Sequence, residues 1–366
     1  MKQNPSTAAF GRAWTEEPKK RREETMRSFI QGAAQALQIL AWLGALFIGP
    51  SAFAQDFYKG KTINFIIGSA PGGGYDTYSR LVAGHIGQHI AGRPSVVPQN
   101  MPGADSVKAS VYLYNTAPKD GTAIGMVDEA IYLHQILDPQ EAKTDATKFN
   151  WIGRILPNSA VLFARSDAQV QKIEDTFTKE LIVSASGAAS KLNWTVLKNT
   201  LGVKFKILSG YQGSNDSMLA MLRGEVDALS QPWSILKISG DHLIRDNKIH
   251  LLLQTGAEKD ADLPQVPRMI DLARNDEERK LLELFASPSL IGRSVLAPPG
   301  LPPERVAELR RAFMATMQDP AFLADVKKAK LDLNPMPGEA LQEAIGKMGN
   351  VPDSLVARAR QVAKEN

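Results

Sequence analysis

The chain has 366 residues, of which 43% are hydrophobic and 22% are charged, a composition typical of a globular protein with a substantial core. It contains no cysteine, which excludes disulfides, thiol nucleophiles, cysteine metal sites and lipoprotein anchoring. Residues 1–54 hold 7 of the 43 basic and 4 of the 39 acidic residues, which leaves a nearly balanced 36 and 35 in the remainder. Without a basic run interleaved with aromatic residues, this balance gives no indication of nucleic-acid binding.

The first 54 residues have the features of a secretory signal peptide. A basic segment precedes an apolar stretch at residues 39–48, and Ala52-Phe53-Ala54 supplies the small residues that a signal peptidase reads. The sequence therefore predicts cleavage after Ala54 and a periplasmic protein, with an uncleaved N-terminal anchor as the alternative. Because the chain from Met26 onward would already make a complete signal, residues 1–25 are a candidate start-site artefact.

The next segment combines a strand, a glycine loop and a helix. An apolar run from Ile63 to Ile67 predicts the strand, Gly72, Gly73 and Gly74 form the loop, and a helical pattern begins at Asp76. Glycines allow positive φ and let a ligand approach bare backbone amides, and Asp76 is expected to cap the helix. The positive end of the helix would then favour an anion such as a carboxylate or a phosphate. A tight structural turn is the alternative interpretation.

The following segments alternate between strands and helices. The expected helices are 76–90, 106–114, a helix through residue 201, and 218–223. The expected strands after the first are 94–97, 122–127, 181–183, 205–208, 226–229, 249–253 and 294–297. This alternation predicts an α/β protein with two lobes, each built on an open and mostly parallel sheet flanked by helices.

Several residues near the predicted loops favour a small-molecule site in the cleft between two such lobes. Lys191 follows a small-residue loop at a helix start, where its ammonium group could reach an anion, and a solvated surface lysine is the alternative. Tyr75, Tyr211 and Trp233 lie in or next to loops, where they could line a pocket. Each of these aromatic residues alone is equally compatible with ordinary packing.

Support for catalysis is weak. Ser234 and Lys237 match the S-x-x-K pattern of penicillin-recognising enzymes, but the companion S-D-N and K-T-G motifs are missing. A dinucleotide fingerprint and a phosphate loop are also missing, and neither a cofactor nor a metal is predicted. The rival hypothesis is a secreted hydrolase that uses Ser186, Ser190 or Ser234 as nucleophile, with Lys191 or Lys237 as its base.

An ordered set of motifs resembles one family. The segment Ala70 to Asp76, with Arg80 after it, is similar to the first ligand loop of the periplasmic receptors of tripartite tricarboxylate transporters, also called Bug receptors. The resemblance covers nearly all of the chain after residue 54, and the ordered set is more specific than any one motif. The further motifs, in the same order, are Asn100 to Ala104, Ala117 to Gly121, Gly210 to Gly213, Gly224 to Asp227, Leu263 to Pro267 and Leu296 to Gly300.

This resemblance implies a monomeric receptor without enzymatic activity. Its two-lobed Venus-flytrap fold would close on a small organic anion, often a carboxylate, and deliver it to the permease subunits of a membrane transporter. The predicted lobes are residues 55–155 together with 257–366, and residues 156–256. The ligand contacts that the resemblance implies are Ser69, Gly73, Gly74, Tyr75 and Asp76 in the first lobe and Ser186, Gly187, Ala188, Ser190 and Lys191 in the second.

Two positions depart from the pattern of the family. Lys191 stands where many members have histidine, and Asp128 and Glu129 follow the third strand where hydroxyl residues are common. Asp128 is therefore also expected at the ligand, and the acid pair would repel a second carboxylate, which makes an amine-bearing or partly neutral ligand conceivable. An extracytoplasmic sensing partner of a signalling system would share this fold and ligand, and it remains an alternative to transport.

Overall fold

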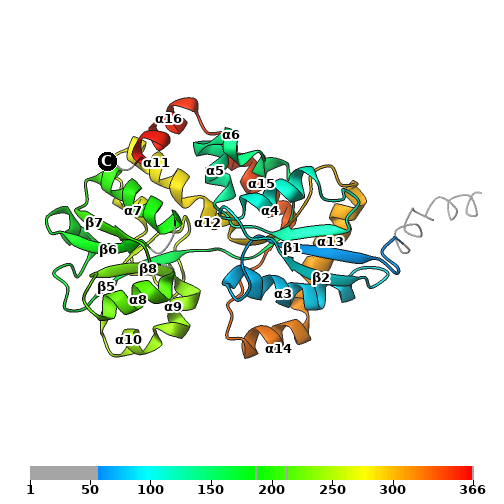
Figure 1. Ribbon diagram of the computed structural model, residues 1–366, viewed down its shortest axis with the longest axis horizontal. Coiled ribbons are helices and arrows are strands. Elements are labelled where there is room, and N and C mark those ends of the chain that lie inside the picture. The colour runs from blue at the N-terminus through cyan, green and yellow to red at the C-terminus, as the bar shows by residue number, and fades with distance from the viewer. Residues whose placement is uncertain (1–56, 186–187, 212, 365–366) are drawn as a thin grey trace, which may run out of the picture. The chain divides into compact units, whose positions relative to one another are not determined.

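The computed structural model describes residues 57–185, 188–211 and 213–364. The predicted signal peptide, Ser186 and Gly187 lie outside the described residues. Within these ranges, two β-sheets are flanked by helices (Figure 1). None of the helices in the described ranges is both long enough and apolar enough to cross a membrane.

The helices and strands follow the expected order, with shifted bounds. The strands are β1 (Thr62–Ile67), β2 (Ser95–Asn100), β3 (Ala123–Met126), β4 (Asn150–Leu156), β5 (Ala160–Arg165), β6 (Leu181–Ala185), β7 (Phe205–Ser209), β8 (Ala228–Pro232), β9 (Ile249–Gln254), β10 (Arg293–Ala297) and β11 (Met336–Pro337). The α-helices are α3 (Gly74–Ile86), α4 (Val107–Asn115), α5 (Ile131–Leu137), α6 (Pro139–Ala142), α7 (Ala188–Leu201), α8 (Ser214–Leu222), α9 (Trp233–Ser239), α10 (Asp241–Arg245), α11 (Asp276–Ala286), α12 (Pro288–Ile291), α13 (Pro303–Gln318), α14 (Pro320–Lys328), α15 (Gly338–Met348) and α16 (Asp353–Val362). The short 3-10 helices are η1 (Gly87–His89), η2 (Ala146–Lys148), η3 (Ile173–Phe177) and η4 (Met269–Leu272).

The six-stranded sheet has the order β11-β4-β10-β3-β1-β2. Strand β1 pairs in parallel with β2 and β3, whereas β10 pairs antiparallel with β3 and β4. Helix α3 packs on β1 and β2, and its side chains of Tyr78, Val82 and Ile86 are buried, as the i, i+4, i+8 spacing predicts. Because the glycine loop joins β1 directly to α3, this packing fixes both ends of the loop.

The five-stranded sheet has the order β7-β6-β8-β5-β9. Strand β6 pairs in parallel with β7 and β8, while β5 pairs antiparallel with β8 and β9. Helix α7 contacts β6 and β7 and buries Trp194 and Leu197 completely. The predicted α/β class is therefore confirmed, and both sheets are mixed, each with a parallel part that continues into antiparallel strands.

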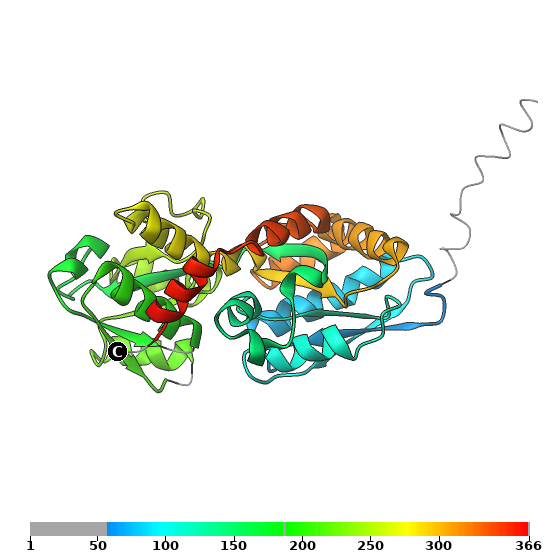
Figure 2. The ribbon, with the colours of Figure 1, turned by 90° about the horizontal axis from the view of Figure 1, so that it is seen from above.

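The chain passes between the two sheets at least twice. The segment 157–159 leads from β4 to β5, and the chain returns through the segment that contains α11 and α12 before it enters β10. The backbone N–H of Asn158 donates to the carbonyl of Ser289 at 3.1 Å, so these crossings lie side by side. The last helix, α16, contacts α5, α7 and α11 (Figures 1 and 2). The exact lobe boundaries stay a prediction.

Candidate functional site

The glycine loop runs from the end of β1 into α3. Gly72 has φ +87°, in the region that favours glycine, and Gly73 is the N-cap of α3. No side chain of the described residues caps this helix, so the expectation that Asp76 is its cap is wrong. The reason is that the helix begins at Gly74, which places Asp76 inside the first turn. The first-turn amides therefore have no side-chain cap from the part of the chain that the structure describes.

Asp76 instead ties the loop together. Its carboxylate accepts hydrogen bonds from the Gly72 N–H at 2.9 Å, the Arg80 Nε at 2.9 Å and the Asn100 Nδ2 at 2.8 Å. Burial alone would raise the pKa of Asp76, but these hydrogen bonds together lower it from 3.8 to about 2. The carboxylate of Asp76 is thus already hydrogen-bonded within the loop, α3 and β2. Its role as a ligand contact stays a prediction.

We expect Asp76→Asn to lower the free energy of unfolding by about 1 to 2 kcal/mol at neutral pH, after allowing for the exposed Arg80 partner. Because the folded-state pKa lies below the unfolded value, the contribution is complete above about pH 4 and is lost as the pH falls towards 2. Urea unfolding of the wild type and Asp76→Asn at several pH values measures the difference in their free energies of unfolding. The difference between them should shrink as the pH falls from 4 to 2, and a difference that does not depend on pH in this window would contradict the assignment.

The other predicted residues of the loop differ in exposure. Gly73 is exposed, whereas Gly74 packs closely against another side chain: a Cβ at Gly74 would lie 2.8 Å from the Nη2 of Arg293. The Ser69 hydroxyl is buried and has no hydrogen-bond partner within the described ranges. The hydroxyl oxygen of Tyr75 accepts a long hydrogen bond, 3.5 Å, from the backbone N–H of Glu129. The loop therefore touches the segment that follows β3.

The acid pair after β3 has two different environments. Asp128 accepts a hydrogen bond from the N–H of Ala130 at 2.8 Å, which closes a local turn. The Oε1 of Glu129 accepts a hydrogen bond from the Nδ2 of Asn158 at 2.5 Å, while its Oε2 is buried and has no partner among residues 57–185, 188–211 and 213–364. Burial raises the pKa of both carboxyl groups. The hydrogen bonds from Ala130 to Asp128 and from Asn158 to Glu129 oppose this shift, and the positive charge of Arg293 opposes it to a smaller extent.

A pocket of about 590 Å³ joins this acid pair to the start of α7. Asp128, Glu129 and Asn158 line it from the six-stranded sheet and its crossing segment, and Ser190 and Lys191 line it from the first turn of α7. The pocket thus brings together three of the predicted ligand contacts from segments distant in the sequence. Ala188 begins α7, while Ser186 and Gly187 lie outside the described residues.

The two predicted aromatic contacts of the second sheet do not line this pocket. Trp233 is only 8% exposed, and its Nε1 donates to the Asp262 carboxylate at 3.1 Å. Tyr211 packs against the same hydrophobic cluster as Trp233, and burial raises the pKa of its hydroxyl. Both side chains thus take part in packing within the five-stranded half, which was the alternative left open for each.

The proposed serine–lysine pair of a hydrolase has no support in the geometry of Lys237. Its Nζ donates at 2.9 Å to both Asp262 and Asp332. Burial opposes ionisation, but the hydrogen bonds to these carboxylates raise the pKa of Lys237 above its ordinary value. An ammonium group held protonated in this way is a poor general base for Ser234.

Arg293 is a candidate site residue that the sequence analysis missed. It is the first residue of β10 and is 4% exposed, and its buried Nε and Nη1 have no hydrogen-bond partners in the described part of the chain. Its guanidinium carbon lies 5.7 Å from the ring centre of Tyr75 and 5.0 Å from that of Tyr78. The only sequence signal was an arginine at the start of an apolar strand, because its proximity to the glycine loop depends on how β10 joins the sheet.

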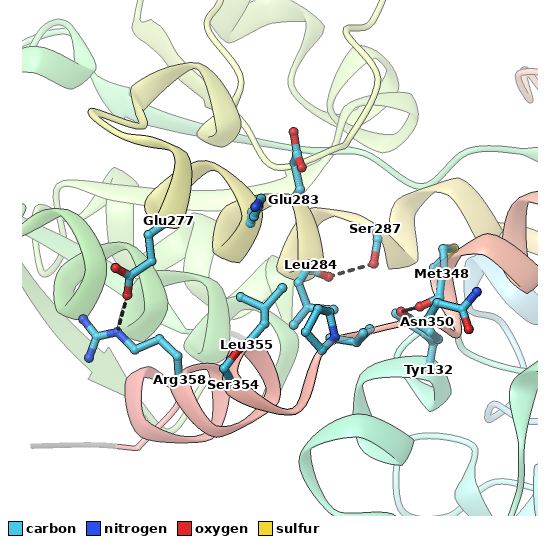
Figure 3. Close-up of a pocket in the computed structure, with 13 residues that line it drawn as sticks. Tyr132, Glu277, Glu283, Leu284, Ser287, Met348, Asn350, Ser354, Leu355 and Arg358 are labelled. Atoms are coloured by element: carbon cyan, nitrogen blue, oxygen red, sulfur yellow. Dashed lines mark hydrogen bonds and ion pairs between the residues drawn. The ribbon is translucent and has the colours of Figure 1, made fainter.

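A second pocket, of about 620 Å³, lies beside α11 and α16 (Figure 3). None of the predicted ligand contacts lines it. Arg358 and Glu277 on its rim form an ion pair at 3.6 Å, and the Tyr132 hydroxyl donates to the Met348 carbonyl at 2.5 Å. Its lining combines apolar side chains such as Leu284 with charged side chains that are partly paired. Because the predicted ligand contacts line the pocket at the acid pair and not this one, the pocket at the acid pair is the better candidate site.

Comparisons with known proteins point to one family. A family model described as Tripartite tricarboxylate transporter family receptor matches residues 79–350. A protein of Agrobacterium vitis, described as a UPF0065 protein in the TAR-I ttuE-ttuC' intergenic region, is 23% identical over 280 residues, which are 74% of this chain and 76% of that protein.

Two solved structures share the fold. A solute binding protein from Polaromonas, solved without ligand, is 18% identical with a TM-score of 0.61, over 83% of this chain and 98% of that one. An R. palustris protein solved with adipate is 19% identical with a TM-score of 0.56, over 83% of this chain and 96% of that one.

Proposed function

Because the chain belongs to the tripartite tricarboxylate transporter receptor family, we propose that it binds a small organic carboxylate in the periplasm and delivers it to the membrane subunits of such a transporter. The family is one of receptors, so the chain is a binding protein and not an enzyme. The proposal for the ligand is supported by the pocket of about 590 Å³, which joins residues that follow β3 to residues of β5, β8 and α7. A volume of this size suits a small organic molecule.

The charges around this pocket suggest how the ligand is oriented. The wall formed by α7 carries Lys191 and the positive end of a 14-residue helix, which together favour a carboxylate. The opposite wall carries Asp128 and Glu129, which favour a hydrogen-bond donor or an ammonium group over a second ionised carboxylate. A carboxylate with a donor group at its other end therefore fits this pocket better than a tricarboxylate does.

A ligand that contacts both walls would stabilise an arrangement in which the two sheets are held together. Asn158 and Ser289 lie in the segments that connect the sheets, and both line the pocket, so a change in their backbone angles would alter the spacing of its walls. The ligand would be held by noncovalent contacts with both walls of the pocket. Its release to the membrane subunits would then require only that these two walls separate.

A thermal-shift screen tests the proposed function. The panel contains mono-, di- and tricarboxylic acids, including adipate, and amino acids, each paired with its uncharged amide at equal concentration. A ligand that binds only the native state raises the unfolding midpoint by mass action, by an amount that grows with its concentration. We expect at least one acid to do so while its amide does not. If no acid raises the midpoint above its amide, the proposed ligand class is wrong.

A further inference from the structure

Lys237 connects the half of the chain built on the five-stranded sheet to the half built on the six-stranded sheet. It lies on α9, which contacts β8 and α10, whereas Asp332 lies between α14 and β11 (Figure 1). Strand β11 pairs with β4 of the six-stranded sheet. The Nζ of Lys237 lies 2.9 Å from the Oδ2 of Asp332, so this ion pair joins segments that belong to different sheets.

The five-stranded half holds the ammonium group of Lys237 in place. The Oδ2 of Asp262 accepts hydrogen bonds from the Nζ of Lys237 at 2.9 Å and from the Nε1 of Trp233 at 3.1 Å. The Nζ also lies 5.9 Å from the ring centre of Trp233, which is buried. Because these contacts orient the ammonium group independently of Asp332, little side-chain entropy is lost when it pairs with Asp332.

The six-stranded half holds Asp332 in a similar way. The hydroxyl of Tyr78, a buried residue of α3, donates to the backbone carbonyl of Asp332 at 2.9 Å. Two residues further on, the N–H of Asn334 donates to the carbonyl of Ile155 in β4 at 2.9 Å. The backbone around Asp332 is thus attached to both α3 and β4. An ion pair between two groups that are each fixed in their own half resists the separation of the halves.

The five-stranded side of this ion pair is continuous with one wall of the pocket of about 590 Å³. Ser230 and Pro232 of β8 line the pocket, and α9 begins at the next residue, Trp233. The N–H of Trp233 donates to the carbonyl of Ser159, which lies in the segment that crosses between the sheets, at 3.1 Å. A displacement of α9 would therefore move both this wall and the crossing segment.

We propose that the ion pair of Lys237 and Asp332 is a latch that favours the arrangement in which the two walls of this pocket come together, so that two side chains outside the pocket raise its affinity for a ligand. The effect on affinity rests on the proposed function, whereas the latch itself does not. Burial lowers the pKa of Lys237, but the hydrogen bonds to Asp332 and Asp262 outweigh burial and raise the pKa above its ordinary value. The latch therefore keeps its positive charge at neutral pH.

The distance between two spin labels measures the latch without any ligand. Because the chain contains no cysteine, Leu222→Cys on α8 and Leu323→Cys on α14 place one label on an exposed position of each half. Double electron–electron resonance then gives the distribution of distances between the labels. In Asp332→Asn, we expect the ratio of molecules at the wild-type distance to molecules at longer distances to fall by about two- to fivefold, as for a half-exposed ion pair.

Asp262→Asn is the matched control. It removes a carboxylate that lies at the same 2.9 Å from the same ammonium group but within one half, and its distribution of distances should equal that of the wild type. Lys237→Gln should behave like Asp332→Asn. Raising the salt concentration should lower the ratio in the wild type and change it little in Asp332→Asn, because screening acts on the charges of the latch.

Calorimetry with the acid that gives the largest thermal shift measures the effect of the latch on binding. We expect the affinity to be about two- to fivefold weaker in Asp332→Asn and unchanged in Asp262→Asn, because the cost of bringing the walls together is added to the cost of binding. An altered distribution of distances with an unchanged affinity in Asp332→Asn would overturn the link between the latch and the pocket.

Equal distributions of distances in Asp332→Asn and Asp262→Asn would overturn the latch, and so would a wild-type ratio that does not depend on salt. If acids bind but these distributions are equal, the proposed function stands and the latch falls. If no acid in the screen binds, the proposed ligand class is wrong, and the distances still decide whether the latch exists. Should Asp332→Asn fail to fold, Lys237→Gln and the salt dependence of the wild type decide.

Discussion

Lys191→Ala is expected to weaken the binding of the organic acid that gives the largest thermal shift by roughly 1 to 3 kcal/mol, the range for a hydrogen bond that involves a charged group. Lys191 lines the pocket from the first turn of α7, so its ammonium group and the amides of that turn act on the same end of the ligand. Isothermal titration calorimetry measures the change in affinity. Lys191→Arg should retain part of the affinity, because the positive charge is kept.

The matched control is Lys198→Ala, which removes an exposed lysine from the last two turns of the same helix. Its affinity for the acid should equal that of the wild type, since a surface charge at that distance is screened by salt. If Lys191→Ala and Lys198→Ala bind the acid equally well, Lys191 is an ordinary surface residue, which was the alternative interpretation from the sequence.

Trp194→Ala is expected to lower the free energy of unfolding by about 3 to 5 kcal/mol, the usual cost of removing a buried aromatic side chain. Trp194 is fully buried, its ring centre lies 5.9 Å from that of Phe205 in an edge-to-face contact, and its Nε1 donates to the Ser184 carbonyl at 3.1 Å. The side chain thus fixes α7 on β6 and β7. Urea unfolding followed by circular dichroism gives the change in free energy.

Two further variants separate the contributions of Trp194. Trp194→Phe keeps most of the apolar contact and loses the indole N–H, so a smaller cost of about 1 to 2 kcal/mol is expected. Leu222→Ala, at a side chain that is 54% exposed, should change the stability by less than about 0.5 kcal/mol. A loss below about 1 kcal/mol in Trp194→Ala would contradict the view that this residue anchors the α7 wall of the pocket.

Much of the fold could be predicted because its signals are local. The apolar runs of β1 and β6 and the glycines after β1 lie close together in the sequence, and the helical periodicity of α3 and α7 follows them directly. The start of α3 was misplaced by two residues for a physical reason. Asp76 is a strong capping residue type, but the helix already begins at Gly74 with Gly73 as its N-cap, and the Asp76 carboxylate is held by Asn100 from β2.

The site was predicted less completely because its parts meet through tertiary packing. The pocket joins Asp128 to Ser190 and Lys191, three of the expected ligand contacts, and their role at the ligand stays a prediction. The orientation of Tyr211 and Trp233 could not be predicted, because an aromatic residue in a loop can face either a ligand or the core. Arg293 reaches the glycine loop only because β10 lies next to β3 in the sheet.

Together, these contacts describe two positive regions and an acid pair. Lys191 and the start of α7 form one of them, and Arg293 and the start of α3 form the other. Asp128 and Glu129 line the pocket together with Lys191, and the charge of Arg293 acts on both carboxyl groups, so the acid pair sets the cost of bringing in a further negative charge. This arrangement favours a small ligand whose charges are distributed along its length.

Amide hydrogen exchange with and without the acid that gives the largest thermal shift tests the central claim most directly. If the ligand is held between the two sheets, exchange should slow in residues 69–76 of the glycine loop and in residues 188–195 of α7 at the same time. Residues 350–358 beside the second pocket should change little. Protection confined to one of the two segments, or found only at residues 350–358, would contradict a carboxylate held between the glycine loop and α7.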